Sequence, residues 1–281
     1  MTHAALLLIL AEGLLTVMDG IIKGLAQRYP TLQIAGLRFI FGFLWAAALV
    51  AVLRPGWPSL ETVKANALRS ALSVGTATLF FYALGVLPLA EVFALSFISP
   101  IFMVLLGVII LGETMEGRIA TGLLMGLAGL ALIVWHRIGT ETYSPDALLG
   151  AAAVIVSALL YAATSILLRA RATRDPIAWI VCVQPILPAV LLLPSAIPGW
   201  TPLSDRDLLI FVAVGLLGTI GHFVLAQAFA RAEAARLAPL HYVTLVWGVL
   251  IGYVFYNEIP SLMVMLGAAL IIIGAVATSA R

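Results

Sequence analysis

Ten long apolar runs follow one another along the 281 residues, and short polar connectors separate them. A helix needs about 20 mostly apolar residues to cross the hydrocarbon layer of a bilayer, which is close to the length of these runs. The chain is 63% hydrophobic and 10% charged, whereas soluble domains are about 45–50% apolar and about 25% charged. A soluble oligomer with a very large core is the alternative, but a lipid environment explains the surplus more simply. The runs are residues 4–26, 32–53, 64–86, 88–111, 117–137, 146–169, 176–197, 207–230, 236–256 and 261–279.

Lipid gives the backbone no hydrogen-bond partners, so only helices and closed barrels cross a membrane. The apolar runs show no strict alternation, which argues against the strands of a barrel. The connectors are too short to hold a soluble domain. We therefore predict an all-α integral membrane protein with ten transmembrane helices.

An internal repeat divides the chain into two halves. Residues 88–113 align with residues 233–258 at an offset of 145, and the acidic pair Glu113 and Glu258 is among the identical positions. The first half, residues 1–140, and the second half, residues 141–281, then hold five helices each. Because five is odd, the second half enters the membrane from the opposite side. Inverted repeats around a central cavity are typical of alternating-access transporters.

The basic residues predict the orientation of the bundle. With the N-terminus inside, ten Lys and Arg side chains lie at cytoplasmic helix ends and five at outer ends. This count places Arg38 at an outer end and Arg69 at a cytoplasmic end. Cytoplasmic connectors carry the excess of positive charge in membrane proteins. We therefore expect both termini to be cytoplasmic.

The first helix holds the most polar stretch of the membrane part. Glu12, Thr16, Asp19 and Lys23 are spaced by 4, 3 and 4 residues, which places them on one helix face. A charge at mid-membrane costs at least about 2.5–3.5 kcal/mol, so such residues face a wet cavity or a partner. We expect Glu12 and Asp19 to line a substrate cavity, where they would allow this half of the bundle to move a proton or to bind an ammonium group. The alternative for Asp19 is a structural pair with Lys23.

Further cavity candidates lie on the third, fourth, sixth, eighth and ninth helices. The stripe of the sixth helix that corresponds to the charged one is Ser157, Tyr161, Thr164 and Leu168. A membrane histidine is more often a core residue than a ligand, and we expect about half of the aromatic residues simply to fill the core. Together with Glu12, Thr16 and Asp19, the candidate cavity residues are Thr76, Tyr82, Phe97, Ser157, Tyr161, His222, Gln227, His241, Tyr242 and Trp247.

Prolines and end-of-helix glutamates are the candidates for hinges and gates. Pro88 begins the fourth helix, and Pro100 and Pro239 lie inside the fourth and ninth helices, where proline removes a hydrogen bond and produces a kink. Glu113 and Glu258 end their helices at opposite faces of the membrane. The alternatives are kinks that only improve packing and carboxylates that only close a short turn.

Two other features are interpreted as scaffold. The seventh helix contains Pro185, Pro188 and Pro194 and offers only Gln184 as a polar group, so we expect it to bend. The fifth and tenth helices are rich in glycine, which lets helices approach closely. We expect these two helices to serve packing or a homodimer contact.

Several classes of enzyme are disfavoured by what the sequence lacks. It contains no HExxH, GxSxG or GxxxxGK[ST] pattern. It has no pair of Asp-rich clusters for Mg²⁺ on a diphosphate, and no His or Cys grouping with metal-ligand spacing. We therefore predict a protein that is not an enzyme and that uses neither a cofactor nor a metal.

Two five-helix halves with a fourth helix of the form P…P-x₆-G-x₅-E resemble the EamA-type members of the drug/metabolite transporter superfamily. The matching residues are Pro88, Pro100, Gly107 and Glu113, with Gly252 and Glu258 in the second half. The second half departs from the pattern, because Leu245 stands where Pro100 predicts a proline. This departure argues against a symmetrical pair of hinges.

The resemblance implies a ten-helix bundle in the bacterial inner membrane, with a central cavity lined mainly by helices 1, 3, 4, 6, 8 and 9. It also implies export of small metabolites, often amino acids, and is closest to the aromatic amino acid exporters; aromatic side chains in the cavity would stack on a substrate or hold an amino group. We expect a secondary, ATP-independent exporter that works by alternating access. One alternative is a sugar-nucleotide or drug carrier, but a phosphate site needs paired cations at mid-membrane, and Lys23, Arg38 and Arg69 are expected near helix ends. The other is a non-transporting membrane scaffold or a lipid enzyme.

Overall fold

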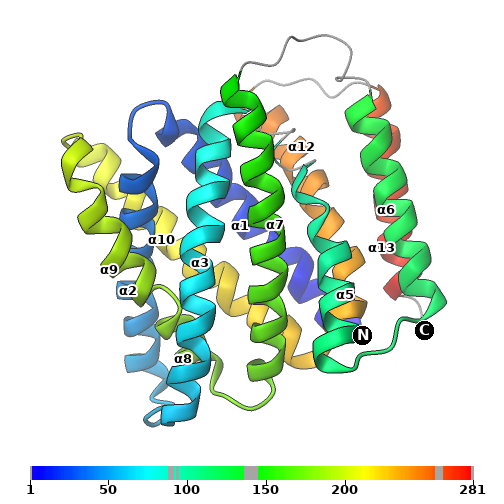
Figure 1. Cartoon of the computed structure of the whole chain (residues 1–281), viewed down its shortest axis with the longest axis horizontal. Helices are drawn as coiled ribbons and strands as arrows, with labels where there is room; N and C mark the ends of the chain where they lie inside the picture. Colours follow the sequence, from blue (N-terminus) through cyan, green and yellow to red (C-terminus); the bar gives the residue numbers. More distant parts are fainter. Residues whose placement is uncertain (1, 88–91, 93–94, 136–144, 257–261, 280–281) are drawn as a thin grey trace.

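The chain is seen in a computed structural model that describes residues 2–87, 92, 95–135, 145–256 and 262–279. Regular structure in these ranges is helical, with no strand among them (Figure 1). The elements are α1 (Thr2–Ala26), α2 (Thr31–Leu53), α3 (Leu60–Val86), α5 (Ser99–Leu111), α6 (Gly117–Trp135), α7 (Pro145–Ala172), α8 (Ile177–Val183), α9 (Ile186–Ser195), η1 (Ile197–Gly199), α10 (Asp205–Arg231), α11 (Ala234–Leu237), η2 (Ala238–Tyr242), α12 (Val243–Tyr256) and α13 (Leu262–Ser279). The all-helical fold class is confirmed.

Seven helical stretches of the described residues are long and apolar enough to cross a membrane. They are His3–Ala26, Thr31–Leu53, Leu60–Val86, Asp146–Ala172, Ile177–Ser195, Asp205–Arg231 and Ala234–Phe255. Helical residues also occupy part of each of the other predicted runs. The count of ten spans therefore stays a prediction.

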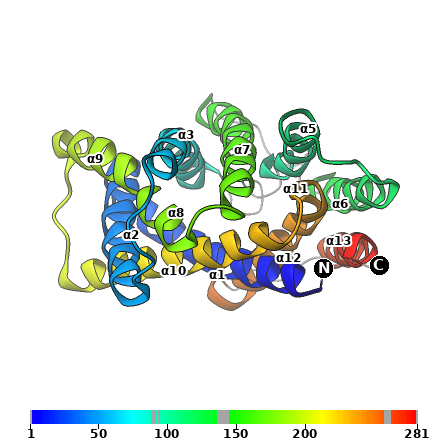
Figure 2. The ribbon, with the colours of Figure 1, turned by 90° about the horizontal axis from the view of Figure 1, so that it is seen from below.

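The two halves of the chain interleave. α1 of the first half packs on α10 of the second, and α3 packs on α7. These are the same pairing with the halves exchanged, as an inverted repeat requires. Figure 2 shows α3, α7 and α5 in one row and α10, α1 and α12 in the row that faces it. The interior between these rows is thus built jointly by both halves.

The N-termini of α3 and α10, which are equivalent helices of the two halves, are capped in the same way. The Ser59 side chain accepts a hydrogen bond of 3.1 Å from the backbone N–H of Thr62 at the start of α3. The Ser204 side chain accepts one of 3.1 Å from the N–H of Asp207 at the start of α10. Serine is a preferred N-cap because its oxygen satisfies an N–H that lacks a partner in the helix. The two serines are 145 residues apart, so the repeat extends to the helix starts.

Three of the predicted helices are broken rather than kinked. The seventh is divided into α8 and α9 at Gln184–Pro185. The fourth has a turn at Phe97–Ile98, and Pro100 then occupies the first turn of α5, where proline is tolerated. The ninth consists of α11, the 3₁₀ segment η2 and α12. Ile177–Ser195 and Ala234–Phe255 still form single stretches able to cross a membrane, as the predicted runs 176–197 and 236–256 require, and the bends expected in them take the form of breaks.

The glycine-rich α6 and α13 pack against each other (Figure 1). A Cβ atom on Gly274 would lie 2.9 Å from the Cβ of Met125 and 3.2 Å from the carbonyl oxygen of Gly122. Only glycine permits this approach, as small residues do between membrane helices. These glycines are therefore used within the chain, and a homodimer through α6 and α13 stays a prediction.

Candidate functional site

A cavity of about 170 Å³ lies between the two rows of helices. A water molecule needs about 10–15 Å³ by this measure, so the cavity has room for on the order of ten waters or a small organic molecule. Its walls come from both halves. The lining side chains are Glu12, Leu15, Met18, Asp19, Arg38, Phe39, Arg69, Ser73, Thr76, Ala77, Phe80, Phe81, Ser96, Phe97, Ser99, Ser157, Ala158, Tyr161, Thr164, Ser165, Leu168, Gln184, His222, Leu225, His241 and Thr244.

The two polar stripes predicted for the first and sixth helices both face this cavity. Glu12 and Asp19 line it from α1, and all four residues of the corresponding stripe line it from α7. The other two members of the charged stripe have different contacts. Thr16 donates its hydroxyl hydrogen to the carbonyl oxygen of Glu12 at 2.6 Å, and the Lys23 ammonium donates to the carbonyl of Leu87 at 3.3 Å.

Glu12 joins the first half of the chain to the broken ninth helix. Its Oε1 lies 2.6 Å from Nδ1 of His241 on η2. Its Oε2 accepts a hydrogen bond of 2.9 Å from the Thr244 hydroxyl on α12. The Tyr161 ring meets the His241 ring edge-on, with centroids 5.9 Å apart. Both Glu12 and His241 are buried, and Nε2 of His241 has no hydrogen-bond partner. This cluster of two titratable groups can hold a proton where the two halves meet.

Two arginines line the cavity, contrary to the prediction that they lie at helix ends. Arg38 is 8% exposed and Arg69 is 2% exposed. Arg38 is seven residues after the start of α2, and Arg69 is nine residues after the start of α3. At 1.5 Å per residue these positions are about 10 Å and about 14 Å inside their helices. The cavity wall therefore includes two cations that the sequence had placed only toward helix ends.

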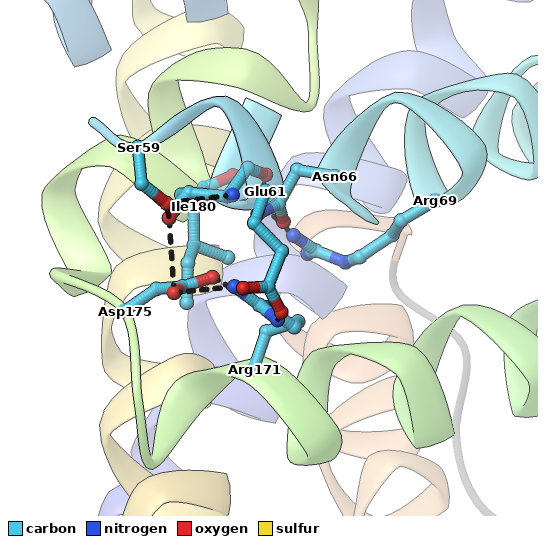
Figure 3. A network of polar contacts seen from close by, with 8 residues as sticks. Ser59, Glu61, Asn66, Arg69, Arg171, Asp175 and Ile180 are labelled. Atoms are coloured by element: carbon cyan, nitrogen blue, oxygen red, sulfur yellow. Dashed lines mark hydrogen bonds and ion pairs between the residues drawn. The ribbon is translucent and has the colours of Figure 1, made fainter. Parts of the chain in front are cut away.

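Gln184 holds Arg69 in place from the break between α8 and α9. Its side-chain oxygen accepts a hydrogen bond of 2.8 Å from Nη2 of Arg69, and its amide nitrogen donates to the Ser73 hydroxyl at 3.1 Å. The Gln184 carbonyl accepts a further hydrogen bond of 2.6 Å from Ser70. Arg69 also donates to the carbonyl of Ile180 at 3.4 Å, and both residues are drawn in Figure 3. The seventh helix was interpreted as scaffold, but its break contributes a residue to the cavity wall.

The candidate residues named from the sequence divide into two groups. Those that line the cavity are Glu12, Asp19, Thr76, Phe97, Ser157, Tyr161, His222 and His241. Those that lie outside its wall are Thr16, Tyr82, Gln227, Tyr242 and Trp247. Gln227 accepts hydrogen bonds from Arg231, and the Trp247 indole donates to the carbonyl of Ile9 at 3.0 Å. Tyr242 lies behind Phe97, fully buried.

At the end of the bundle where α3 begins and α7 ends, an ionic network ties these helices together (Figure 3). The Arg171 guanidinium donates two hydrogen bonds to the Asp175 carboxylate, at 2.6 and 2.7 Å. Its remaining Nη1 donates to Glu61 at 2.7 Å. The Thr62 hydroxyl donates to Asp175 at 3.0 Å. The network fixes the start of α3 to the connection that follows α7.

Glu113 lies at the same end and spans the two halves. Its Oε1 accepts a hydrogen bond of 3.0 Å from the backbone N–H of Ala234, and its Oε2 accepts one of 2.8 Å from Ala235. Nε of Arg169 on α7 lies 3.7 Å from the same carboxylate. Glu113 therefore does more than close its own turn, because it binds the start of α11 in the second half.

The Gly-x₅-Glu pattern of the fourth helix has a structural reason. Gly112 has a φ of 66°, a left-handed conformation that ends α5 and suits glycine. The backbone N–H of Glu113 then donates to the carbonyl of Gly107 at 3.2 Å. A Cβ atom on Gly107 would lie 2.8 Å from Oε2 of Glu113. The absent side chain thus leaves the room that the carboxylate occupies.

The remaining hinge candidates have no contact with the cavity in the described residues. Pro100 is buried near the start of α5, and Pro239 is buried within η2. Pro88 and Glu258 lie outside the described residues. In the described ranges no group of three His, Cys, Asp or Glu side chains is arranged to hold a metal ion.

Comparison with known proteins places both halves in one family model. The model of the EamA-like transporter family matches residues 3–135 and again residues 148–280. The chain is similar to the pseudopaline exporter of Pseudomonas aeruginosa, with 26% identity over 98% of this chain and 95% of that protein. It is also similar to the S-adenosylmethionine uptake transporter of Rickettsia prowazekii, with 26% identity over 92% of this chain and 85% of that protein. The riboflavin transporter of Rhizobium johnstonii is 25% identical over 95% of this chain and 88% of its own length.

A solved crystal structure supports the fold. It superposes with a TM-score of 0.77 and covers 98% of this chain and 95% of its own. Its sequence identity is 21%, so it bears on the arrangement of the helices alone.

Proposed function

Since this membrane protein belongs to the EamA-like transporter family, we propose that it is a secondary, ATP-independent exporter of amino acids or similar small metabolites. It would reside in the bacterial inner membrane with both termini cytoplasmic. Transport would occur by alternating access, with the substrate bound in the central cavity while the halves rock about it. The relatives named above are transporters of small molecules, which supports the class of substrate.

The observation that carries this proposal is the mixed charge of a small cavity between the inverted halves. Acidic groups (Glu12 and Asp19) and basic groups (Arg38 and Arg69) line the same space. An amino acid carries both charges at neutral pH, and a buried charge needs a partner of opposite sign. Substrate sites of inverted-repeat transporters lie where the two halves meet.

Counterflow in proteoliposomes tests the proposal. Vesicles with purified protein are loaded with one unlabelled amino acid, and uptake of the same labelled amino acid is followed without ATP, for each of the twenty amino acids. We expect accumulation of at least one of them above the level of protein-free vesicles. Absence of flux for all twenty, with a folded preparation, would reject amino acids as substrates.

The second candidate within this family is a sugar-nucleotide or drug carrier. The presence of both arginines in the cavity favours a phosphate-bearing substrate more than the sequence suggested. Two carboxylates in the same cavity oppose it, because like charges repel at short range. The same vesicles with a labelled sugar nucleotide, or with a cationic dye as a model drug, separate these cases from amino acid export.

A further inference from the structure

Arg38 is a buried cation that lacks an anionic partner. It is 8% exposed, and no described carboxylate lies within ion-pair distance of it. Its Nε is buried without a hydrogen-bond partner. An isolated charge away from water is expensive, so buried charges are normally paired. A group that is absent from the chain itself must therefore complete this site.

The surroundings of Arg38 hold its guanidinium flat and leave its edge free. The guanidinium carbon lies 4.4 Å from the centroid of the Phe39 ring and 5.8 Å from that of Phe81. Arginine stacks on aromatic faces in this way, and its N–H groups then point outward in the plane. Gly218 packs beside the guanidinium, since a Cβ atom there would be in ordinary van der Waals contact with Nη2 at 3.6 Å. The free edge borders both the main cavity and a smaller one that it shares with His222.

The second arginine of the cavity is less available. Arg69 donates to the Gln184 side chain and to the Ile180 carbonyl. The two carboxylates of the cavity also differ in how far they are engaged by other groups of the protein. Glu12 is occupied by His241 and Thr244, whereas Asp19 is half-buried and lines the same cavity as Arg38 without an ion pair between the two. Arg38 and Asp19 are thus an unjoined pair of opposite charges in one cavity.

From this geometry we infer that the cavity takes a zwitterionic substrate whose carboxylate binds the edge of Arg38 and whose ammonium group faces Asp19. Guanidinium and carboxylate form paired parallel hydrogen bonds, which supply both energy and orientation. This inference rests on the proposed function and specifies which chemical groups of the substrate are recognised. It also assigns Arg38 as the anchor for the anionic end.

Binding to the purified protein in detergent provides the test, with the thermal unfolding midpoint as readout. A ligand that binds only the folded state raises this midpoint in a concentration-dependent manner. The probes are the twenty amino acids, the amide of each amino acid that binds, and sodium chloride. We expect an amide, which lacks the carboxylate, to need at least about a ten-fold higher concentration for the same shift in the midpoint. Loss of a hydrogen bond to a charged group lowers the affinity by at least about this factor.

Variants locate the carboxylate. R38Q should weaken amino acid binding at least about ten-fold, and R38K, which keeps the charge without the planar fork, should have an intermediate effect. R206Q is the matched control, because Arg206 is exposed at the start of α10 and away from the cavity. Without ligand, R38M should unfold at or above the wild-type midpoint, because it removes an unpaired buried charge. A purely structural arginine would instead make R38M less stable.

The outcomes separate the inference from the proposed function. Equal binding of an amino acid and its amide, unchanged binding by R38Q, or stabilisation by chloride alone would overturn the role of Arg38. A wild-type midpoint that none of the twenty amino acids raises would overturn it as well. If R38Q transported an amino acid in counterflow with the half-saturating concentration of the wild type, the exporter proposal would be supported. The role of Arg38 as the anchor would be rejected. Carboxylate-dependent binding without flux would support the anchor and reject export.

Discussion

The rings of Phe97 and Tyr242 meet with their centroids 5.4 Å apart. The two residues are 145 positions apart in the sequence and thus occupy equivalent places in the two halves. Each lies where its helix is interrupted, by the Phe97–Ile98 turn in one half and by the end of η2 in the other. The two interruptions therefore lie next to each other where the halves of the chain meet. Phe97 forms part of the cavity wall there.

The position of Tyr242 depends on Gly126 of α6. A Cβ atom on Gly126 would collide with Cδ2 of Tyr242, whose ring is fully buried and has no room to shift. We expect G126A to destabilise the fold by about 1–3 kcal/mol, as overpacking does in a dense core. Thermal unfolding in detergent measures this loss.

The control for this substitution is G117A, since a Cβ atom on Gly117 meets no atom within 4 Å. It should leave the unfolding midpoint nearly unchanged. The double variant G126A/Y242A should lose less stability than the sum of the losses in the two single variants, because removing the ring removes the clash. A fully additive double variant would argue against the contact.

The polar stripes show which cavity residues can be predicted from the spacing of polar residues along a helix. A charge inside lipid must face a cavity, so the period of the helix was enough to direct Glu12 and Asp19 inward. The arginines were missed because their depth was judged from predicted helix ends. The third helix starts at Leu60 rather than residue 64, which moves Arg69 deeper. The predicted start was thus four residues late, a larger error than is usual at helix ends, and it placed Arg69 too close to the end of its helix.

The broken helices were only partly predictable. Proline indicated a disturbance near Pro100 and another near Pro239, whereas Leu245 at the position equivalent to Pro100 argued against a symmetrical pair. The structure nevertheless interrupts both halves, because packing of Phe97 on Tyr242 and of Tyr242 on Gly126 acts between distant residues. Such tertiary contacts leave no local signal in the sequence. The same holds for Gln184, whose role depends on Arg69 more than a hundred residues away.

Proton coupling is expected to pass through Glu12. This carboxylate lies 2.6 Å from His241 and accepts a hydrogen bond from Thr244, so its charge state affects the junction of α1 with η2 and α12. In E12Q the side chain no longer titrates. We expect net transport driven by a pH gradient to be lost while exchange of substrate across the membrane persists, as measured in proteoliposomes with and without an imposed gradient.

Two further variants test this assignment. D19N should weaken substrate binding but keep the response to the pH gradient, because Asp19 faces the substrate and is not joined to His241. E116Q removes a carboxylate outside the cavity, where Glu116 pairs with Arg236, and should behave as wild type. If E12Q retained the wild-type response to the gradient, the proton would have to be carried elsewhere.

Glu113 is expected to hold one end of the cavity closed. It caps the first N–H groups of α11, and removing such a cap costs about 0.5–2 kcal/mol. E113A should therefore raise the open population at this end by about two-fold to thirty-fold. The measurement is the rate at which a maleimide labels L168C in a C182S background, because Leu168 lines the cavity next to Arg169 and the native Cys182 is removed.

The comparison for E113A is E116A, which removes only an exposed ion pair between the same connection and Arg236 of α11, a kind of pair that contributes little to stability. It should leave the labelling rate unchanged. Equal rates in E113A and E116A would mean that Glu113 stabilises only the local turn and does not control access to the cavity.

The hydrogen bond between Gln184 and Arg69 should stabilise the break in the seventh helix. Q184L leaves the Arg69 guanidinium buried with only the longer contact of 3.4 Å to the Ile180 carbonyl. Loss of a hydrogen bond to a charged group costs about 1.5–3 kcal/mol, which should lower the unfolding midpoint in detergent. S195A, which removes an exposed hydroxyl from the adjoining α9, is the control and should have little effect.

The double variant R69M/Q184L decides whether that cost comes from the stranded charge. Replacing both partners by apolar side chains of similar size is often nearly neutral, whereas removing one leaves an unpaired charge. The double variant should therefore unfold at a higher temperature than Q184L alone. An unfolding midpoint below that of Q184L would indicate that Arg69 stabilises the fold through its remaining contacts. In that case the cost of Q184L would come mainly from the lost hydrogen bond between the Gln184 side-chain amide and Ser73.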